Sequence, residues 1–248
     1  MEPNRKFLLV LISILLLVST ACAAAGPQAT ATATNTSAPP TATKRPTSTP
    51  RPTATPNVAA TQQFEAFYSL LDSYEQKGYL STTDGTARTI KPFNEEWAQL
   101  NWYQWWPEDT VNSDFVFSGR FKWSAAFSSP DVSGCGIIFG LQDNSDHYAV
   151  FLDKSRILFL MARGSHVYNV GKTRGPGRVS YTLPAEADFV ISVKDKSAYV
   201  SVDGEVTEYT LSQDQSTEGD FALSLLSGTN KDYGTRCEIT DMILWTAK

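Results

Sequence analysis

The sequence predicts an all-β domain, an antiparallel sandwich or barrel, preceded by a disordered tether and one amphipathic helix. Three observations support this prediction. Short apolar stretches recur at regular intervals through residues 79–248, several of them alternating with polar residues. Turn-forming residues separate these stretches. Residues 22–57 hold seven of the 13 prolines and no aromatic residue, so this segment cannot bury enough apolar surface to fold.

The N-terminus has the order of a secretion signal. Two basic residues precede the apolar run 7–18, and the small residues 19–21 lead to Cys22. This ending resembles the bacterial lipoprotein signal, in which the cysteine is lipidated and becomes the first mature residue, although Ser19 stands where that signal prefers Leu. We therefore expect a signal peptide over 1–21, a lipid anchor at Cys22 and a location in the cell envelope. Simple secretion is one alternative. An uncleaved helix is the other, but the run is shorter than the roughly 20 residues that span a bilayer.

The charge of the chain excludes one class of partner. From residue 58 onward there are 16 Lys and Arg against 25 Asp and Glu, a net charge of −9. An acidic domain gains nothing from the counterion release that drives nucleic-acid binding, so we expect no nucleic-acid partner. The tether carries three basic residues and no acidic one, so only the tether and the lipid favour the membrane.

The cysteine count agrees with export. The chain has three cysteines, and with Cys22 assigned to the lipid, Cys135 and Cys237 are left for a disulfide in a compartment that permits one. Two buried free thiols are the alternative.

A helical period appears in residues 58–78. Thr61 is the predicted cap and Gly78 the predicted stop. The apolar positions are spaced by threes and fours: Phe64, Phe67, Tyr68, Leu70, Leu71 and Tyr74. We expect this face to pack on the β domain, and a helix left free to bind a partner is the alternative.

The strand pattern is clearest in residues 114–123. Alternate positions place one set of large residues on a single face: Phe115, Phe117, Phe121 and Trp123, with Gly119 among them. Similar stretches begin at residues 135, 147, 156, 188, 197, 220 and 236. Several are apolar on one face only, so two sheets can enclose a core while their outer faces stay in contact with water.

The order of these stretches resembles that of a known family. DFVFSGRFKW is followed by GCGIIFGLQDNSDHYAVFLD, DFVISVKDKSAYVSVDGEVTEYTL, FALSLLSGTN and CEITDMILW. Over residues 114–245 this resembles concanavalin A-like lectin and glucanase domains, in particular the laminin-G-like and 3-keto-disaccharide-hydrolase-like branches. The resemblance implies a jelly-roll sandwich whose last strand, ending near Trp245, pairs beside the first. It also implies that Cys135 and Cys237 lie on strands close enough to bridge.

The residues do not support the glucanase chemistry of that family. Retaining glucanases of this fold carry E-x-D-x-x-E on one strand, and their two catalytic carboxyl groups stand about 5 Å apart. No such run is present, and the acidic pairs on predicted strands are three residues apart, hence on opposite faces: Glu205 with Glu208 and Glu238 with Asp241. The two histidines have no metal-ligand spacing, and there is no G-x-S-x-G motif. We expect no catalytic residue and no cofactor, while an enzyme whose carboxylates meet only in the fold stays an alternative.

One acidic turn is a weak candidate for a Ca²⁺ site. Asp143 and Asp146 flank Asn144 and supply oxygen ligands. Ca²⁺ takes six or more oxygens, and the sequence does not show the others. A plain Asx turn is the alternative.

The most unusual composition lies in residues 97–109, which hold four of the six tryptophans. Large aromatic rings either fill a core or present a surface on which sugar rings stack. If 97–105 is one strand, Tyr103 and Trp105 share one side and Trp102 lies on the other. The predicted ligand-binding residues are Trp102, Tyr103, Trp105, Trp106, Arg163, His166 and Tyr168.

The sequence thus predicts a lipid-anchored binding module at the cell surface. A glycan is the expected ligand. A structural or protein-interaction domain with a cell-envelope protein as partner is the alternative, favoured if the aromatic run is wholly buried.

Overall fold

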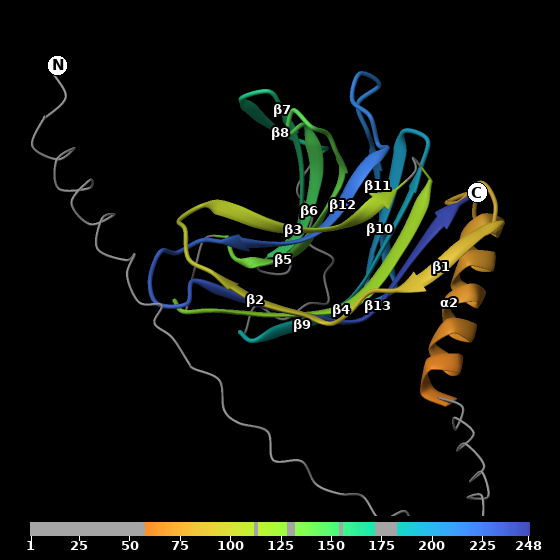
Figure 1. Cartoon of the computed structure of the whole chain (residues 1–248), viewed down its shortest axis with the longest axis horizontal. Coiled ribbons are helices and arrows are strands. Elements are labelled where there is room, and N and C mark those ends of the chain that lie inside the picture. Colours follow the sequence, from red (N-terminus) through yellow and green to blue (C-terminus); the bar gives the residue numbers. More distant parts are fainter. Residues whose placement is uncertain (1–57, 112–113, 128–131, 154–155, 172–182) are drawn as a thin grey trace, which may run out of the picture. The chain divides into compact units, whose positions relative to one another are not determined.

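A computed structural model of the chain describes residues 58–111, 114–127, 132–153, 156–171 and 183–248. The predicted signal peptide, Cys22 and the tether lie outside these residues. Within the described part, two antiparallel sheets enclose a core, and one helix packs on the outside of the first sheet (Figure 1). The predicted antiparallel sandwich with one N-terminal helix is confirmed.

Sheet A has seven strands, ordered β1-β13-β4-β9-β10-β11, with β2 also pairing with β13. β1 lies antiparallel to β13, with Gly85 opposite Ala247, so the last strand pairs beside the first as the family resemblance implied. The bounds are β1 (Gly85–Thr89), β2 (Phe93–Trp97), β4 (Phe115–Ala125), β9 (Ala185–Lys194), β10 (Ser197–Val202), β11 (Glu205–Thr210) and β13 (Thr235–Ala247).

Sheet B has six strands, ordered β3-β12-β5-β6-β7-β8. Strands β5 to β8 follow one another as antiparallel neighbours, while β12 returns to lie between β5 and β3. The bounds are β3 (Trp102–Val111), β5 (Gly134–Leu141), β6 (His147–Asp153), β7 (Arg156–Arg163), β8 (His166–Asn169) and β12 (Gly219–Ser227).

The core lies between the sheets because alternate residues of each strand point inward. On β4 the aromatic positions predicted to share a face are fully or almost fully buried. The ring of Phe121 stacks on Phe189 of β9 with centroids 4.6 Å apart, and Phe117 meets Phe221 of β12 at 5.2 Å. Each buried aromatic ring of this kind stabilises the fold by about 1.5–3 kcal/mol relative to exposure.

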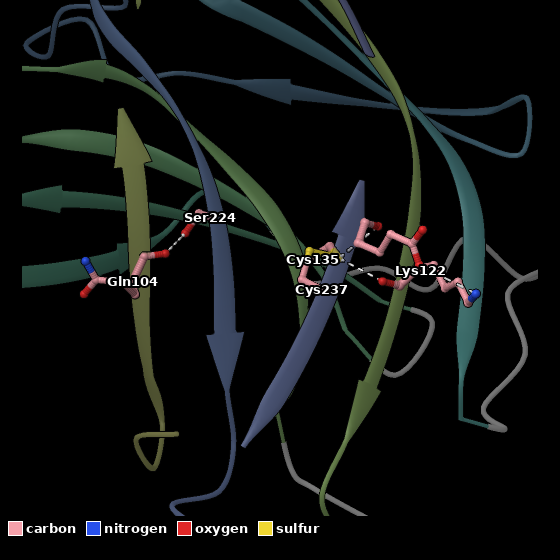
Figure 2. The surroundings of a disulfide bond; sticks show 6 residues. Gln104, Lys122, Cys135, Ser224 and Cys237 are labelled. Carbon is pink, nitrogen blue, oxygen red and sulfur yellow. Dashed lines mark hydrogen bonds and ion pairs between the residues drawn. A yellow bond between two sulfur atoms is a disulfide. The ribbon is translucent and has the colours of Figure 1, made fainter. Parts of the chain in front are cut away.

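A disulfide joins the two sheets through the core (Figure 2). Cys135 lies on β5 of sheet B and Cys237 on β13 of sheet A, with Cα atoms 5.3 Å apart, and both are fully buried. The predicted disulfide is confirmed. It ties the sheets together at the point where β13 crosses β5.

The helix α2 (Val58–Gln76) packs on the outer face of sheet A. Its side chains Phe67, Leu71 and Tyr74 are buried with Val116, Ile243 and Trp245 of the sheet. Of the two alternatives for this helix, the structure shows the docked one. Among the described residues, no helix is both long and apolar enough to cross a membrane.

The ends of α2 were predicted with different success. Gly78, with φ of +76°, follows its last turn as expected. Thr61 was predicted as the cap, but it lies inside the helix, which begins at Val58. The three helical residues before Thr61 include two alanines, the residue type with the highest helix propensity. The helix therefore starts before Thr61 rather than at it.

A bulge in β13 creates the apolar surface on which α2 packs. The pairing of β13 with β4 shifts between Thr240 and Ile243, where Asp241 adopts a positive φ of 54°. Before the bulge the odd-numbered residues of β13 point into the core, and after it the even-numbered ones do. Ile243 and Trp245 therefore turn outward, toward the helix.

Candidate functional site

An aromatic cluster lies on the outer face of sheet B and at its β3 edge. Tyr103 and Trp105 of β3 meet His147 and Phe151 of β6 on the outer face. Trp102, which pairs with Ser227 at the start of the edge strand β3, brings its ring alongside that of Tyr103. Tyr103 and Trp105 group with the apolar residues of this outer face.

Trp106 belongs to the opposite side of the same strand. It packs against the core and meets Phe93 of β2 with ring centroids 5.2 Å apart. The tryptophan-rich run therefore contributes both to the core, through Trp106, and to the outer face of sheet B, through Tyr103 and Trp105.

Tyr103 is the centre of the cluster. Its ring centroid lies 5.9 Å from that of Trp102, 5.9 Å from that of Trp105 and 5.3 Å from that of Phe151. The rings of Trp102 and Tyr103 are nearly parallel, at 18°. Tyr103 is only 7% exposed while Trp102 is 51% exposed, so Trp102 offers its ring to solvent and Tyr103 supports it.

Small residues form the floor beneath these rings. Strands β12 and β5 lie between β3 and β6, so Tyr103 and Phe151 meet only by reaching across them. The Phe151 ring lies directly against Gly136 of β5, where a Cβ atom would collide with it. The hydroxyl of Ser224 on β12 donates a hydrogen bond to the backbone oxygen of Gln104 on β3 at 2.7 Å (Figure 2).

Hydrogen bonds fix the orientation of Tyr103. His147 Nδ1 lies 2.7 Å from the backbone oxygen of Ser145, and Nε2 lies 2.8 Å from the Tyr103 hydroxyl. A carbonyl oxygen only accepts, so we assign the proton to Nδ1, and the Tyr103 hydroxyl donates to Nε2. The hydrogen bond to His147 therefore fixes the orientation of the Tyr103 side chain.

Both partners of this bond are neutral near pH 7. Burial raises the pKa of Tyr103 to about 12. Burial also lowers the pKa of His147 below its ordinary value of 6.5, opposed by the Ser145 carbonyl and by the charge of Asp146. The aromatic cluster thus contains no ionised group of its own at neutral pH.

The other predicted binding residues lie elsewhere. Arg163 ends β7, and His166 and Tyr168 lie on β8, the edge of sheet B opposite to β3. Tyr168 pairs with Met161, which packs against the core side, so the side chain of Tyr168 projects to the other face from Tyr103. Of the seven predicted residues, the structure brings together Trp102, Tyr103 and Trp105.

The sequence analysis did not assign His147 and Phe151 to the site. The signal that would have found them is the alternation in HYAVFLD, which places His147, Ala149 and Phe151 on one face of β6. Nothing local indicates that this is the face shared with Tyr103, because that depends on the order of strands in the sheet.

The predicted Ca²⁺ residues form a hydrogen-bonded turn. The Asp146 carboxylate accepts from the Gly164 amide at 2.6 Å and from the Asn144 side chain at 3.1 Å. Asp143 lines a separate hollow of about 450 Å³ together with Asp220. Among the described residues no three His, Cys, Asp or Glu side chains are grouped to hold a metal ion, and the Ca²⁺ site stays a prediction.

Asp153 and Asp220 on the outer face of sheet B stand too far apart to act together in glycoside hydrolysis. Asp153 is fully buried and accepts hydrogen bonds at 2.9 Å from Nε and Nη2 of Arg156. Its row of the sheet contains Gly134 and Leu226, and Asp220 lies six residues along β12 from Leu226. That is roughly 20 Å at ~3.3 Å per residue, whereas catalytic carboxyl groups stand about 5–9.5 Å apart.

A further hollow, of about 210 Å³, lies on sheet A around Arg120. Arg120 forms ion pairs there with Glu186 and with Asp188. This hollow presents charged groups and no exposed aromatic ring, so the aromatic cluster is the stronger candidate for recognition.

No family model matches the chain, and no curated protein matches it. The fold is similar to that of the carbohydrate-binding module CBM66 from Bacillus subtilis, with 8% identity, a TM-score of 0.44 and coverage of 63% of this chain and 93% of that one. It is also similar to the Emp47p carbohydrate recognition domain, with 12% identity, a TM-score of 0.45 and coverage of 65% and 91%. For A. japonicus CB05 the identity is 10% and the TM-score 0.48, and the match covers 70% of this chain but 28% of that chain.

These neighbours include carbohydrate-binding domains, and what they share with this chain is the fold. The structure defines a two-sheet β-sandwich with an aromatic cluster on the outer face of sheet B and at its β3 edge.

Proposed function

We propose that this chain is a glycan-binding module that holds its ligand on the aromatic cluster, displayed at the cell envelope on a lipid-anchored tether. The observation that supports it best is the position of Trp102. This ring is half exposed at the start of the edge strand β3 and lies nearly parallel to the buried ring of Tyr103.

The physical basis is the match between an aromatic ring and the apolar C–H face of a sugar. A half-exposed tryptophan gains by covering its ring, and its N–H edge stays available for polar contacts. Tyr103 is held by His147 and by its ring neighbours before any ligand arrives. A supporting ring that is already ordered lowers the entropy cost of binding.

Catalysis is not proposed. Asp153 is engaged by Arg156, and Asp220 is too distant to complete an acid and base pair with it. The arrangement of the aromatic cluster favours holding a sugar rather than cleaving one.

Affinity electrophoresis of the full-length chain in gels containing polysaccharides tests the proposal. The wild type should be retarded by at least one polysaccharide, and the Trp102→Ala variant should lose that retardation. Tyr68→Ala is the matched control, because Tyr68 is a similarly exposed aromatic (46%) on the distant face of α2.

Two results would contradict the proposal. If no polysaccharide retards the wild type, the chain does not bind glycans. If Trp102→Ala is retarded as strongly as the wild type, binding occurs away from the aromatic cluster.

The proposed anchor has its own test. Cells expressing the wild type and a Cys22→Ala variant are labelled with radioactive palmitate and fractionated. Labelled wild type in the membrane fraction and unlabelled variant are expected. Equal labelling of the two, or none of either, would refute lipidation at Cys22.

A further inference from the structure

We infer that the ligand of the aromatic cluster is an uncharged glycan chain, several sugar units long, rather than an acidic glycan or a single sugar. This inference rests on the proposed function and concerns the class of glycan. It follows from the charge of the face, the charge of the domain and the extent of the cluster.

The described face around the cluster offers no free charge to an acidic sugar. His147 is neutral because burial lowers its pKa, and both ring nitrogens are already engaged, Nδ1 donating to the Ser145 carbonyl and Nε2 accepting from Tyr103. The guanidinium of Arg156 donates from two nitrogens to the buried carboxylate of Asp153, so the charges of this pair compensate each other. A carboxylate or sulfate on a ligand would lose water here without gaining a cation.

The net charge of the whole domain also disfavours an acidic glycan. Residues 58–248 carry a net charge of −9, which repels a polyanion and slows its approach. An uncharged chain feels no such repulsion, so its binding should depend little on salt. By contrast, attraction between opposite charges would weaken as the Debye length falls to about 8 Å at physiological ionic strength.

The extent of the cluster indicates more than one sugar. Trp102 is half exposed and Trp105 is partly exposed, whereas Tyr103, His147 and Phe151 are buried beside them. Trp102 and Trp105 lie three residues apart on β3, which is about 10 Å at ~3.3 Å per residue. A chain lying along β3 would cover both rings, whereas a single sugar would cover Trp102 alone.

The test compares neutral and acidic polymers on the same full-length protein. Mixed-linkage β-glucan, xylan and galactomannan form the neutral set, and polygalacturonate and alginate the acidic set, each at 20 mM and 150 mM NaCl. We expect binding to at least one neutral polymer, with an affinity that changes less than about twofold between the two salt concentrations. Trp102→Ala should weaken it by about tenfold or more, and Tyr68→Ala should not.

Chain length is tested by competition. A hexasaccharide cut from the bound polymer should displace it at a much lower concentration than the corresponding monosaccharide. Equal potency per mole of the two would overturn the multi-unit part of the inference.

Binding to the acidic set that is as strong as, or stronger than, binding to the neutral set would overturn the uncharged part and leave glycan binding itself intact. Failure of every polymer would refute the proposed function, and this inference with it. Neutral binding that is unaffected by Trp102→Ala would overturn the assignment to the aromatic cluster.

Discussion

Replacing Cys135 and Cys237 together by alanine should lower the free energy of unfolding by about 4–5 kcal/mol. The bridge joins residues separated by 102 positions, and closing a loop of about 100 residues removes chain entropy worth about 4.7 kcal/mol from the unfolded state at 25 °C. Both sulfur atoms lie in the core between the sheets, so alanine is preferred to serine, which would bury two hydroxyl groups.

Urea unfolding followed by tryptophan fluorescence measures this effect. With a slope of about 3 kcal/mol/M, the midpoint of the double variant should fall by about 1.5 M. Wild-type protein reduced while unfolded and kept reduced should behave like the variant. If the oxidised wild type and the double variant share one midpoint and one slope, the bridge does not stabilise the sandwich and the reasoning fails.

Further predictions concern the helix, the histidine and the glycine floor. Leu71→Ala should lower the free energy of unfolding by about 2–5 kcal/mol in urea titrations, because Leu71 is fully buried between α2 and sheet A. Tyr68→Ala, at an exposed position of the same helix, should change it by less than about 0.5 kcal/mol. Equal effects of the two variants would show that α2 is not docked. The pKa of His147 is lowered in the folded state, so its contribution is complete above its ordinary pKa of about 6.5 and is lost as the pH falls below it. Urea midpoints at pH 7.5 and 5.0 should therefore differ less in His147→Gln than in wild type, and exposed His166→Gln should match the wild type; a full pH effect in His147→Gln would contradict this. Gly136→Ala should lower the melting temperature, because the added methyl group collides with Phe151, and an unchanged melting temperature would show that the ring does not rest there.

Local pattern was enough to predict the class of fold. Alternation in β4 identified the buried face that meets Phe221 and Phe189, and the three- and four-residue spacing in α2 identified the side that packs on sheet A. The disulfide followed from cysteine count and the family resemblance. These features depend on periodicity and composition, which the sequence shows directly.

Other features depend on contacts between distant segments. The run 97–105 was considered as one strand, but it is divided between β2 and β3 by a turn in which Asn101 has a φ of +54°. Gly234, far along the chain, forms a bridge with Trp97 and packs against the start of this turn. The turn contains no Gly or Pro to mark it in the sequence.

The composition of the site was predicted only in part for the same reason. Alternation placed Tyr103 and Trp105 on one side of β3, and the structure confirms that arrangement. Their meeting with His147 and Phe151 depends on the order of strands in sheet B, and the separation of Tyr168 from them depends on which face of β8 it occupies.

The exposure of Trp102 with and without ligand tests the central claim most directly. Trp102 is the most exposed of the six tryptophans, so acrylamide should quench its fluorescence first. A neutral polysaccharide that binds should lower the quenching of wild-type protein, and Trp102→Phe should show no such protection. Equal protection in both proteins, or quenching that the bound polymer leaves unchanged, would contradict a glycan resting on the aromatic cluster.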